Sequence, residues 1–254
     1  KVILFLEDIV DKLKLGMVGG GQGAFIGSVH RIAARIDDHY NLVAGSLASK
    51  PDIAHASAKE LGISSDRSYS SYDEMAEKES ARDDGIDVVA IVTPNFLHYP
   101  VADAFLKKGI HVICDKPLTH NLDDANNFFE SVKNSKALFA LTHNYTGYPM
   151  VRQAREMFRN GEIGKLRIIQ VEYAQDWLTL PIENEGQKQA SWRTDPTKAG
   201  MGGSIGDIGS HAFNLADFIT GAKLTELCAD ISSFVKGRKN DDNAHVLLRY
   251  ENGV

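Results

Sequence analysis

Asp207 and His211 form a pair of side chains that can move a proton. They lie four residues apart in the run Asp207-Ile208-Gly209-Ser210-His211, and in a helix this spacing places both on one face, one turn apart. A histidine accepts a proton near neutral pH, and a nearby carboxylate orients it or raises its basicity. Two other interpretations stay open: the pair binds a metal ion, or Asp207 caps the helix while His211 packs beside Phe213. No further ligand stands at a recognisable spacing, so we expect no metal.

Lys116 is a second side chain placed for chemistry. It stands in Asp115-Lys116-Pro117, directly after an apolar run at residues 110–114 that predicts a buried strand. Ligands of open parallel sheets bind outside the carboxyl ends of the strands, so a lysine there points into a cleft and can hydrogen-bond or polarise an oxygen. Pro117 stiffens the turn. The alternative is an exposed loop lysine paired with Asp115.

Thr93-Pro94-Asn95 follows the preceding predicted strand and brings an amide to the same edge of the sheet. The Asn95 amide can bond ribose hydroxyls, while Thr93 and Pro94 shape a rigid rim. Asn95 can equally cap the helix that follows it, or serve in both ways. His98 fits an ordinary helix residue better than a catalyst.

The elements that position these residues begin with a glycine turn at residues 13–27, LKLGMVGGGQGAFIG. Gly19, Gly21 and Ala24 match the G-x-G-x-x-G/A spacing, which permits a tight turn, backbone approach to a pyrophosphate and close packing of the next helix. The N-terminus of that helix directs free N–H groups toward the phosphates. The alternative is a turn that binds nothing.

Strand and helix patterns alternate as far as residue 141 and predict a doubly wound parallel sheet with right-handed crossovers. After the first strand, strands are expected at residues 42–47, 86–92, 110–114 and 137–141, and helices at residues 23–36, 52–61, 71–81, 98–108 and 121–132. The third helix is expected to begin at Ser71 or Asp73. This part, residues 1–145, is the predicted dinucleotide-binding domain.

Near residue 145 the pattern changes, and residues 146–254 predict a second domain. A helix at 148–159 is followed by alternation from Leu166 to Tyr173, typical of a strand with one wet face. An irregular polar stretch, Asp176 to Gly203, precedes a helix at 206–219 and antiparallel strands at 227–235 and 244–250. The chain stops at an Asn-Gly pair that ordinarily turns a hairpin, which suggests a portion of a longer protein.

Composition excludes several classes of protein. A net charge of −6 with a pI near 5.8 argues against binding to nucleic acid or an anionic membrane surface. Cys114 and Cys228 are the only cysteines, which excludes a disulfide framework and suits a reducing compartment. The apolar segment from Val2 to Leu6 is too short for a signal or membrane span. We therefore expect a cytoplasmic protein without membrane or nucleic-acid partners.

Taken together, these motifs resemble the Gfo/Idh/MocA oxidoreductases, the family of glucose–fructose oxidoreductase and inositol dehydrogenase. The likeness covers nearly the whole chain, in order: the glycine turn, Thr93-Pro94-Asn95 with His98, Asp115-Lys116-Pro117, residues 144–149, Trp192-Arg193, and Gly202-Gly203 leading to Asp207 and His211. The resemblance implies a Rossmann domain followed by an α+β domain with a largely antiparallel open sheet, incomplete in this chain. It also implies a homo-oligomer, a dimer or tetramer.

The resemblance further implies NAD(P)-dependent hydride transfer to or from a sugar, inositol or other polyol. Lys116 would hold the reacting oxygen, His211 would exchange its proton, and Asp207 would orient His211 or bind a substrate hydroxyl. The implied substrate wall comprises Asn144, Tyr148, Trp192 and Arg193, with His143 less firmly placed. The implied cofactor residues are Gly19, Gly21, Gln22, Ala24, Phe25, Ser49, Thr93, Pro94, Asn95, His98, Asp115 and Lys116.

The chain departs from the family pattern at three places. The glycine turn is about three residues longer than usual for the family, so either Ala24 or Gly27 is the third small residue. The second strand ends near Ser49 and Lys50 without the acid that binds an NAD ribose, which leaves NADP open. Asn214 stands where many relatives have an acid, which leaves the substrate class open. An NAD-dependent glycosidase, a nucleotide-sensing regulator, and a flavin or S-adenosylmethionine binder remain alternatives.

Overall fold

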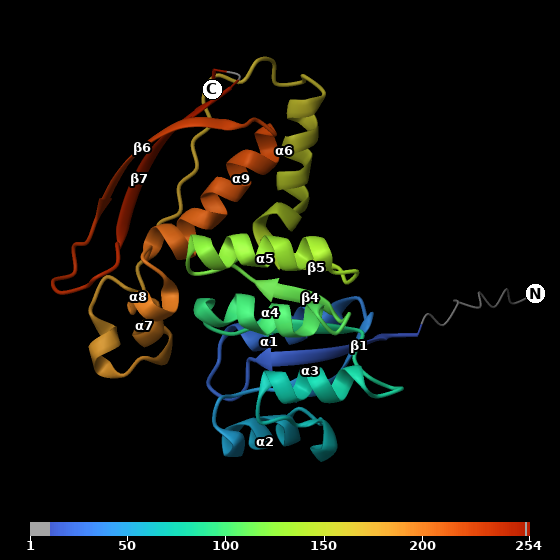
Figure 1. Ribbon diagram of the computed structural model, residues 1–254. Helices are drawn as coiled ribbons and strands as arrows, with labels where there is room; N and C mark the ends of the chain where they lie inside the picture. Colours follow the sequence, from blue (N-terminus) through green and yellow to red (C-terminus); the bar gives the residue numbers. More distant parts are fainter. Residues whose placement is uncertain (1–10, 252) are drawn as a thin grey trace, which may run out of the picture. The chain divides into compact units, whose positions relative to one another are not determined.

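The computed structural model describes residues 11–251, 253 and 254 and divides them into two compact units (Figure 1). Unit 1 contains residues 11–93, 98–114 and 127–140, and unit 2 contains residues 94–97, 115–126 and the described residues from 141 onward. The apolar segment at Val2 to Leu6 lies outside the described residues, as does Asn252 of the expected hairpin turn. In the part of the chain that is described, no helix is both long and apolar enough to cross a bilayer.

Unit 1 is built on a parallel sheet of five strands in the order β2-β1-β3-β4-β5. The strands are β1 (Leu13–Gly19), β2 (Tyr40–Ser46), β3 (Val88–Val92), β4 (His111–Asp115) and β5 (Phe139–Thr142). The first strand, β1, is second in the order of the sheet; from it the chain moves out to the edge strand β2 and returns to β3 on the other side of β1. Such a reversal of strand order opens a crevice at the carboxyl ends of the two diverging strands. Here those ends are Gly19 and Val92.

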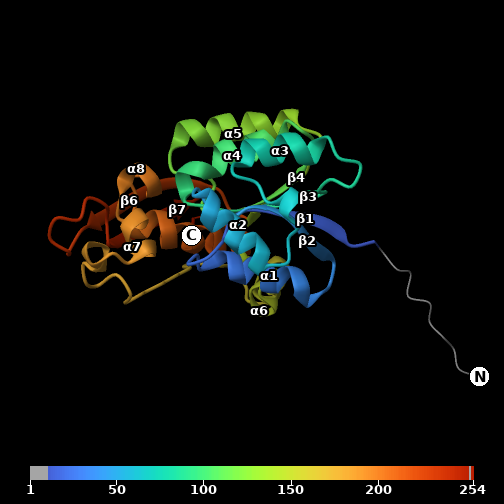
Figure 2. The same cartoon turned by 90° about the horizontal axis from the view of Figure 1, so that it is seen from below.

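Helices cover both faces of this sheet, as expected for a doubly wound fold. They are α1 (Ile26–Ile36), α2 (Pro51–Glu60), α3 (Tyr72–Ser80), α4 (His98–Leu106) and α5 (Leu122–Asn134). Figure 2 shows α1 on one face and α3, α4 and α5 on the other. The buried strand β3 therefore reads as an uninterrupted apolar run, VVAIV. Ser71 caps α3 by accepting a hydrogen bond from the Glu74 N–H at 3.1 Å, so of the two predicted starts, Ser71 and Asp73, the structure has Ser71.

Unit 2 combines helices with a separate two-stranded antiparallel sheet. Its helices are α6 (Pro149–Arg159), α7 (Lys188–Arg193), α8 (Pro196–Ala199) and α9 (Ser210–Thr220), and its strands are β6 (Leu224–Ser232) and β7 (Asn243–Tyr250). In the register of the sheet, Leu227 faces Leu248 and Ala229 faces Val246. The predicted fold class, a doubly wound sheet plus an α+β part, is confirmed.

The strand predicted from Leu166 to Tyr173 is absent, and that prediction was wrong. The segment is extended chain that makes no backbone hydrogen bond to any described residue. Alternating polar and apolar side chains suit a strand, but strand geometry is stabilised by a neighbouring ladder, which this segment lacks. The irregular stretch from Asp176 to Gly203 contains the short helices α7 and α8.

Candidate functional site

The glycine turn of unit 1 has the geometry of a backbone cradle. Gly19 and Gly20 adopt φ values of +81° and +74°, which disfavour residues with side chains. A Cβ on Gly21 would lie 2.6 Å from the Leu47 carbonyl oxygen. A Cβ on Gly27 would lie 2.4 Å from Gly20 Cα, so Gly27 is the small residue that brings α1 against the turn. The cradle and the adjoining start of α1 fit a dinucleotide pyrophosphate.

Four other residues predicted to bind the cofactor are Ala24, Gln22 and Phe25 in the glycine turn and Ser49 after β2. Ala24 lies beside the turn, where its N–H donates to the Gly21 carbonyl at 3.0 Å. The Gln22 N–H donates to Ser57 Oγ at 3.0 Å. Phe25 is 67% exposed, and Ser49 is also exposed at the end of β2.

Thr93 and His98 form a buried corner after β3 in unit 1. His98 is 1% exposed, and its Nε2 lies 3.0 Å from the Thr93 carbonyl oxygen. Thr93 Oγ1 is buried and has no hydrogen-bond partner among the described residues. His98 therefore supports the corner from inside, as an ordinary helix residue would.

Pro94 and Asn95 belong to unit 2. The Pro94 carbonyl accepts from the Leu97 N–H at 3.0 Å in a short turn ahead of α4. The Asn95 amide is buried and donates to the Ala199 carbonyl at 2.9 Å. This contact ties the residue to α8 across more than a hundred residues of sequence.

Lys116 points at Asp207, in unit 2. Its ammonium donates to the Asp207 carbonyl oxygen at 2.7 Å and forms an ion pair with the Asp207 carboxylate. The Lys116 side chain is 15% exposed. Asp115 accepts hydrogen bonds from the Lys116 backbone N–H and from Thr142 Oγ1, both at 2.9 Å. The alternative of an exposed lysine paired through its ammonium with Asp115 is therefore wrong.

Asp207 is held by two cations. Besides Lys116, Arg193 donates from Nε to Asp207 Oδ2 at 3.2 Å. Burial opposes ionisation of the Asp207 carboxyl, but the charges and hydrogen bonds of Lys116 and Arg193 outweigh it and hold its pKa below the ordinary value. The carboxylate therefore stays ionised at neutral pH.

The backbone around Asp207 is a π-helical segment, Ile205–Gly209, that continues into α9. Such bulges occur frequently at functional sites because they redirect side chains within a helix. Here Asp207 and His211 do not hydrogen-bond each other, although they lie four residues apart. Asp241 holds the start of this segment by accepting from Gly203 N, Ser204 Oγ and Ile205 N at 2.6–2.7 Å.

His211 is a buried, neutral imidazole. The residue is 6% exposed, and its ring contacts the Tyr145 ring edge-to-face, with centroids 4.6 Å apart. Burial, followed by the positive charge of Lys116 and the proximity of His143, lowers the pKa of His211 to about 4. At neutral pH the ring is therefore unprotonated and free to accept a proton.

Of the predicted substrate-wall residues, Arg193 binds Asp207 and contacts Trp192, and Tyr148 packs near His211 through Tyr145, whereas Asn144 is exposed. Arg193 stacks on Trp192 at 4.2 Å and lies 5.7 Å from the Trp177 ring centroid. Tyr148 is 53% exposed and packs edge-on against Tyr145. Asn144 is exposed at the start of the 3₁₀ turn Asn144–Gly147.

Sequence reasoning missed three residues of this site, Tyr173, Gln175 and Trp177. They come from the end of the extended segment and follow one another at every second position. Tyr173 Oη lies 2.5 Å from Tyr145 Oη, and Gln175 donates to it at 3.2 Å. The available signal was the run Tyr-Ala-Gln-Asp-Trp, which is rich in aromatic and amide groups that bind hydroxyls.

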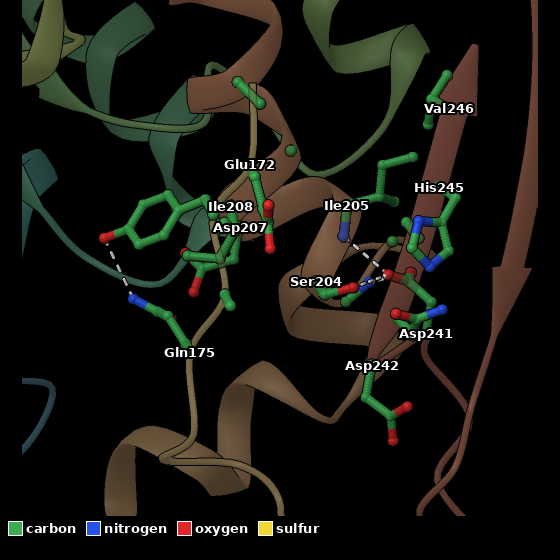
Figure 3. A pocket seen from close by; sticks show the side chains of 18 of the residues that line it. Glu172, Gln175, Ser204, Ile205, Asp207, Ile208, Asp241, Asp242, His245 and Val246 are labelled. Atoms are coloured by element: carbon green, nitrogen blue, oxygen red, sulfur yellow. Dashed lines mark hydrogen bonds between the residues drawn. The ribbon is translucent and has the colours of Figure 1, made fainter. Parts of the chain in front are cut away.

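A cavity of about 1020 Å³ opens within unit 2 beside these residues. Figure 3 shows Gln175 and Asp207 on one side of it, and Ser204 and Ile205 bonded to Asp241 on the other. Its volume is at the upper end of the range of about 300–1,000 Å³ for small-molecule pockets. Among the described residues, no group of three or more His, Cys, Asp or Glu is arranged to hold a metal ion.

Comparison with known proteins gives two family matches that together span most of the chain. The model described as "Oxidoreductase family, NAD-binding Rossmann fold" matches residues 13–143. The model described as "GFO/IDH/MocA C-terminal domain" matches residues 151–254.

Individual relatives agree with these matches. The uncharacterized oxidoreductase YfiI of Bacillus subtilis is 35% identical over 98% of this chain, and the levoglucosan dehydrogenase of Pseudarthrobacter phenanthrenivorans is 30% identical over 90%. The chain spans 64% and 56% of the lengths of these two relatives. An inositol dehydrogenase homologue from Azotobacter vinelandii, solved with NADH and myo-inositol, superposes with a TM-score of 0.88 and 32% identity. That alignment covers 96% of this chain and 62% of the other. The chain therefore belongs to the Gfo/Idh/MocA oxidoreductase family, as its motifs predict, and its N-terminal part is the NAD-binding Rossmann fold of that family.

Proposed function

We propose that the protein transfers a hydride between a nicotinamide cofactor and a sugar, inositol or other polyol. The observation that carries this proposal is a neutral, buried His211 in the same unit as a lysine that is oriented by a doubly held carboxylate. A base and a cation of this kind are what removal of a hydroxyl proton requires. Family membership and the myo-inositol bound to a relative support the substrate class.

Each side chain has a distinct role in this proposal. The Lys116 ammonium hydrogen-bonds the reacting oxygen and stabilises negative charge that develops on it. An imidazole nitrogen of His211 accepts the hydroxyl proton during oxidation and returns it during reduction. Asp207 fixes the direction of Lys116 through the ion pair. When bound, the nicotinamide ring supplies the chemistry of accepting or donating the hydride.

The proposed substrate wall consists of Asn144, Tyr148, Trp192 and Arg193, with His143 beside them. Arg193 has a second task, since its Nε already binds Asp207. We propose Trp192 as an apolar platform for the C–H face of a sugar ring, because it is a large, half-buried aromatic side chain beside Arg193, whose guanidinium carbon lies 4.2 Å from the Trp192 ring centroid.

The cofactor site in this proposal is centred on the glycine cradle and the start of α1. Ser49 and Lys50 are exposed at the end of β2, where no acid is present to select the NAD ribose. A lysine tolerates a 2′-phosphate, so we propose that NADP is accepted alongside NAD.

The proposed domains are a dinucleotide-binding domain at residues 1–145 and a substrate domain at 146–254.

We propose a homo-oligomer, a dimer or tetramer. Light scattering after gel filtration will measure its mass. We also propose a cytoplasmic location, since the chain has only two cysteines, Cys114 and Cys228, which suits a reducing compartment. Cell fractionation tests the location.

The test of the function is a screen of sugars, inositols and their acids with NAD and NADP, following absorbance of the reduced nicotinamide. Lys116→Ala and His211→Ala are expected to lower kcat/KM by about 10²–10⁴-fold. Lys133→Ala, at an exposed position on α5, serves as the matched control and is expected to retain activity.

Nucleotide binding without turnover of any compound would favour the alternative of a nucleotide-sensing regulator instead. Unaltered turnover in both site variants would reject the assigned residues.

A further inference from the structure

The orientation of His211 needs an explanation that Asp207 does not supply. The Asp207 carboxylate is occupied by Lys116 and Arg193. No hydrogen bond or ion pair joins the His211 ring to any residue that the structure describes. A base that is to receive a proton along a defined line must nevertheless be held to within a few tens of degrees.

The side chain with the closest ring contact to His211 is Tyr145. The two ring centroids are 4.6 Å apart at an interplanar angle of 71°, which is a favourable edge-to-face arrangement. The His143 ring lies farther away, at 6.1 Å, and the Tyr173 ring at 6.4 Å. Tyr145 therefore limits the rotation of the imidazole and excludes water from one side of it.

Tyr145 is itself held through its hydroxyl. The Tyr145 and Tyr173 hydroxyl oxygens are 2.5 Å apart, and Gln175 Nε2 donates to Tyr173 Oη at 3.2 Å. Trp177 Nε1 donates to Gln175 Oε1 at 3.2 Å. Because an indole N–H only donates, it fixes which end of the Gln175 amide accepts and which end donates to Tyr173. Tyr173 then has its own proton available for Tyr145.

The far end of this chain of contacts returns to the ion pair. Trp177 lies under the Arg193 guanidinium at 5.7 Å, and Arg193 binds Asp207, which pairs with Lys116. Residues 173–177 are thus connected to both groups that are proposed to act on the substrate. They reach the His211 imidazole through Tyr145, and the Lys116 ammonium through Arg193 and Asp207.

The geometry points to Tyr145 as the positioning residue of His211, held in place by Tyr173 at the end of the extended segment. This inference rests on the proposed function, for which it names the residue that aims the base. Tyr145 takes no proton in this role and acts on the reaction only through His211.

The pH behaviour of His211 reports on this role. The groups that face the ring are Lys116, His143, Tyr145, Tyr173, Asp115 and Asp207. Burial is the largest cause of its low pKa, ahead of the Lys116 charge. Removing the Tyr145 ring admits water, so the pKa of His211 is expected to rise toward its ordinary value of 6.5 while the neighbouring charges stay in place.

The experiment compares Tyr145→Ala, Tyr145→Phe and Tyr173→Phe in the full-length protein. The His211 ring is titrated by NMR without substrate, and the pH profile of kcat is measured with a substrate from the screen. Tyr145→Ala is expected to raise the His211 pKa and to lower kcat about tenfold or more. The two Phe variants keep the rings. Both lose the contact between the two tyrosine hydroxyls, and Tyr173→Phe also loses the hydrogen bond from Gln175, so losses of about two- to fivefold are expected.

Tyr250→Phe is the matched control, because it removes another tyrosine hydroxyl of unit 2, one that donates to Asp217 at 3.2 Å. Unchanged His211 titration and kcat in Tyr145→Ala would overturn the positioning role. Equal effects of Tyr173→Phe and Tyr250→Phe would overturn the part assigned to Tyr173. Absence of turnover in the wild type would instead count against the proposed function, and the NMR titration would still decide the role of Tyr145.

Discussion

Asp207 and His211 obtain their different states from their different neighbours. Both are largely buried, and burial disfavours the charged form of each. Two cations compensate for this at Asp207, which stays ionised. The same Lys116 charge acts against protonation of His211, which stays neutral. The charge of Lys116 therefore favours the ionised form of Asp207 and disfavours the protonated form of His211.

The pH dependence of polyol oxidation follows from the state of His211. In the proposed function the active form is the neutral imidazole, so we expect activity to be lost as pH falls through the pKa of His211, which is about 4. We expect kcat/KM for oxidation to stay nearly constant from pH 7 down to about 5. A pH profile with a substrate that does not titrate in this range measures it. A decline centred near 6.5 would contradict the prediction.

At the scale of elements, the join between the glycine turn and α1 is set by one residue. Gly27 lies in the first turn of α1, and its Cα hydrogens face the Gly20 backbone. Gly27→Ala is expected to push the helix from the turn, to lower the free energy of unfolding by about 1–3 kcal/mol and to weaken dinucleotide binding. Urea unfolding and a nucleotide titration measure the two effects.

The control for this variant is Gly147→Ala, because a Cβ there meets nothing within 4 Å. Its free energy of unfolding is expected to stay within about 0.5 kcal/mol of the wild type. Normal nucleotide affinity in Gly27→Ala would show that the close approach is not needed for binding.

A second element, the connection between β6 and β7, anchors the irregular stretch of unit 2. Arg238 is 2% exposed and binds Glu183 at 3.0 Å, Asp242 at 3.2 Å and the Leu178 carbonyl at 2.9 Å. Arg238→Met leaves two half-buried carboxylates, Glu183 and Asp242, without their cation, which is expected to cost about 1–3 kcal/mol. We expect lower stability in urea and faster amide hydrogen exchange at residues 178–183.

Arg249→Met provides the comparison, since Arg249 forms an exposed ion pair with Glu226. Exposed pairs contribute about 0–1 kcal/mol. Similar losses in the two variants would mean that Arg238 does not anchor the stretch.

At the scale of the whole molecule, the residues proposed for cofactor binding and those proposed for proton transfer fall in different units. The dinucleotide cradle belongs to unit 1, and Lys116, Asp207 and His211 belong to unit 2. In the proposed function, the Rossmann sheet presents strand ends for a cofactor, while the α+β unit carries the groups proposed to act on a substrate oxygen. This division agrees with the separate family matches at residues 13–143 and 151–254.

Nucleotide binding is expected to stabilise the protein as a whole. A ligand that binds only the folded state at 100 times its Kd adds about 2.7 kcal/mol to the free energy of unfolding. Thermal unfolding with NAD and with NADP at equal concentration ranks the two cofactors, and the preferred one gives the larger rise in Tm. AMP, which lacks the pyrophosphate and nicotinamide, is the control. No rise with either dinucleotide at millimolar concentration would count against the proposed cradle.

Much of the architecture was predictable because its signals are local. Apolar runs such as residues 86–92, the glycine cluster after β1 and the Ser71 cap each depend on a few neighbouring residues. They predicted the alternation of strands and helices and therefore the fold class. The Leu166 to Tyr173 strand failed for the opposite reason, because strand formation depends on a partner that is distant in sequence.

For the site, the sequence alone determined that Lys116 directly follows a strand and that Asp207 and His211 lie four residues apart in one helical segment. Only the tertiary structure decided what each one touches. Lys116 and Asp207 meet across 91 residues of sequence, and Tyr145 and Tyr173 meet across 28. A carboxylate that spacing assigned to His211 is instead bound by two cations, because charge and burial are settled in space by the packing of distant segments.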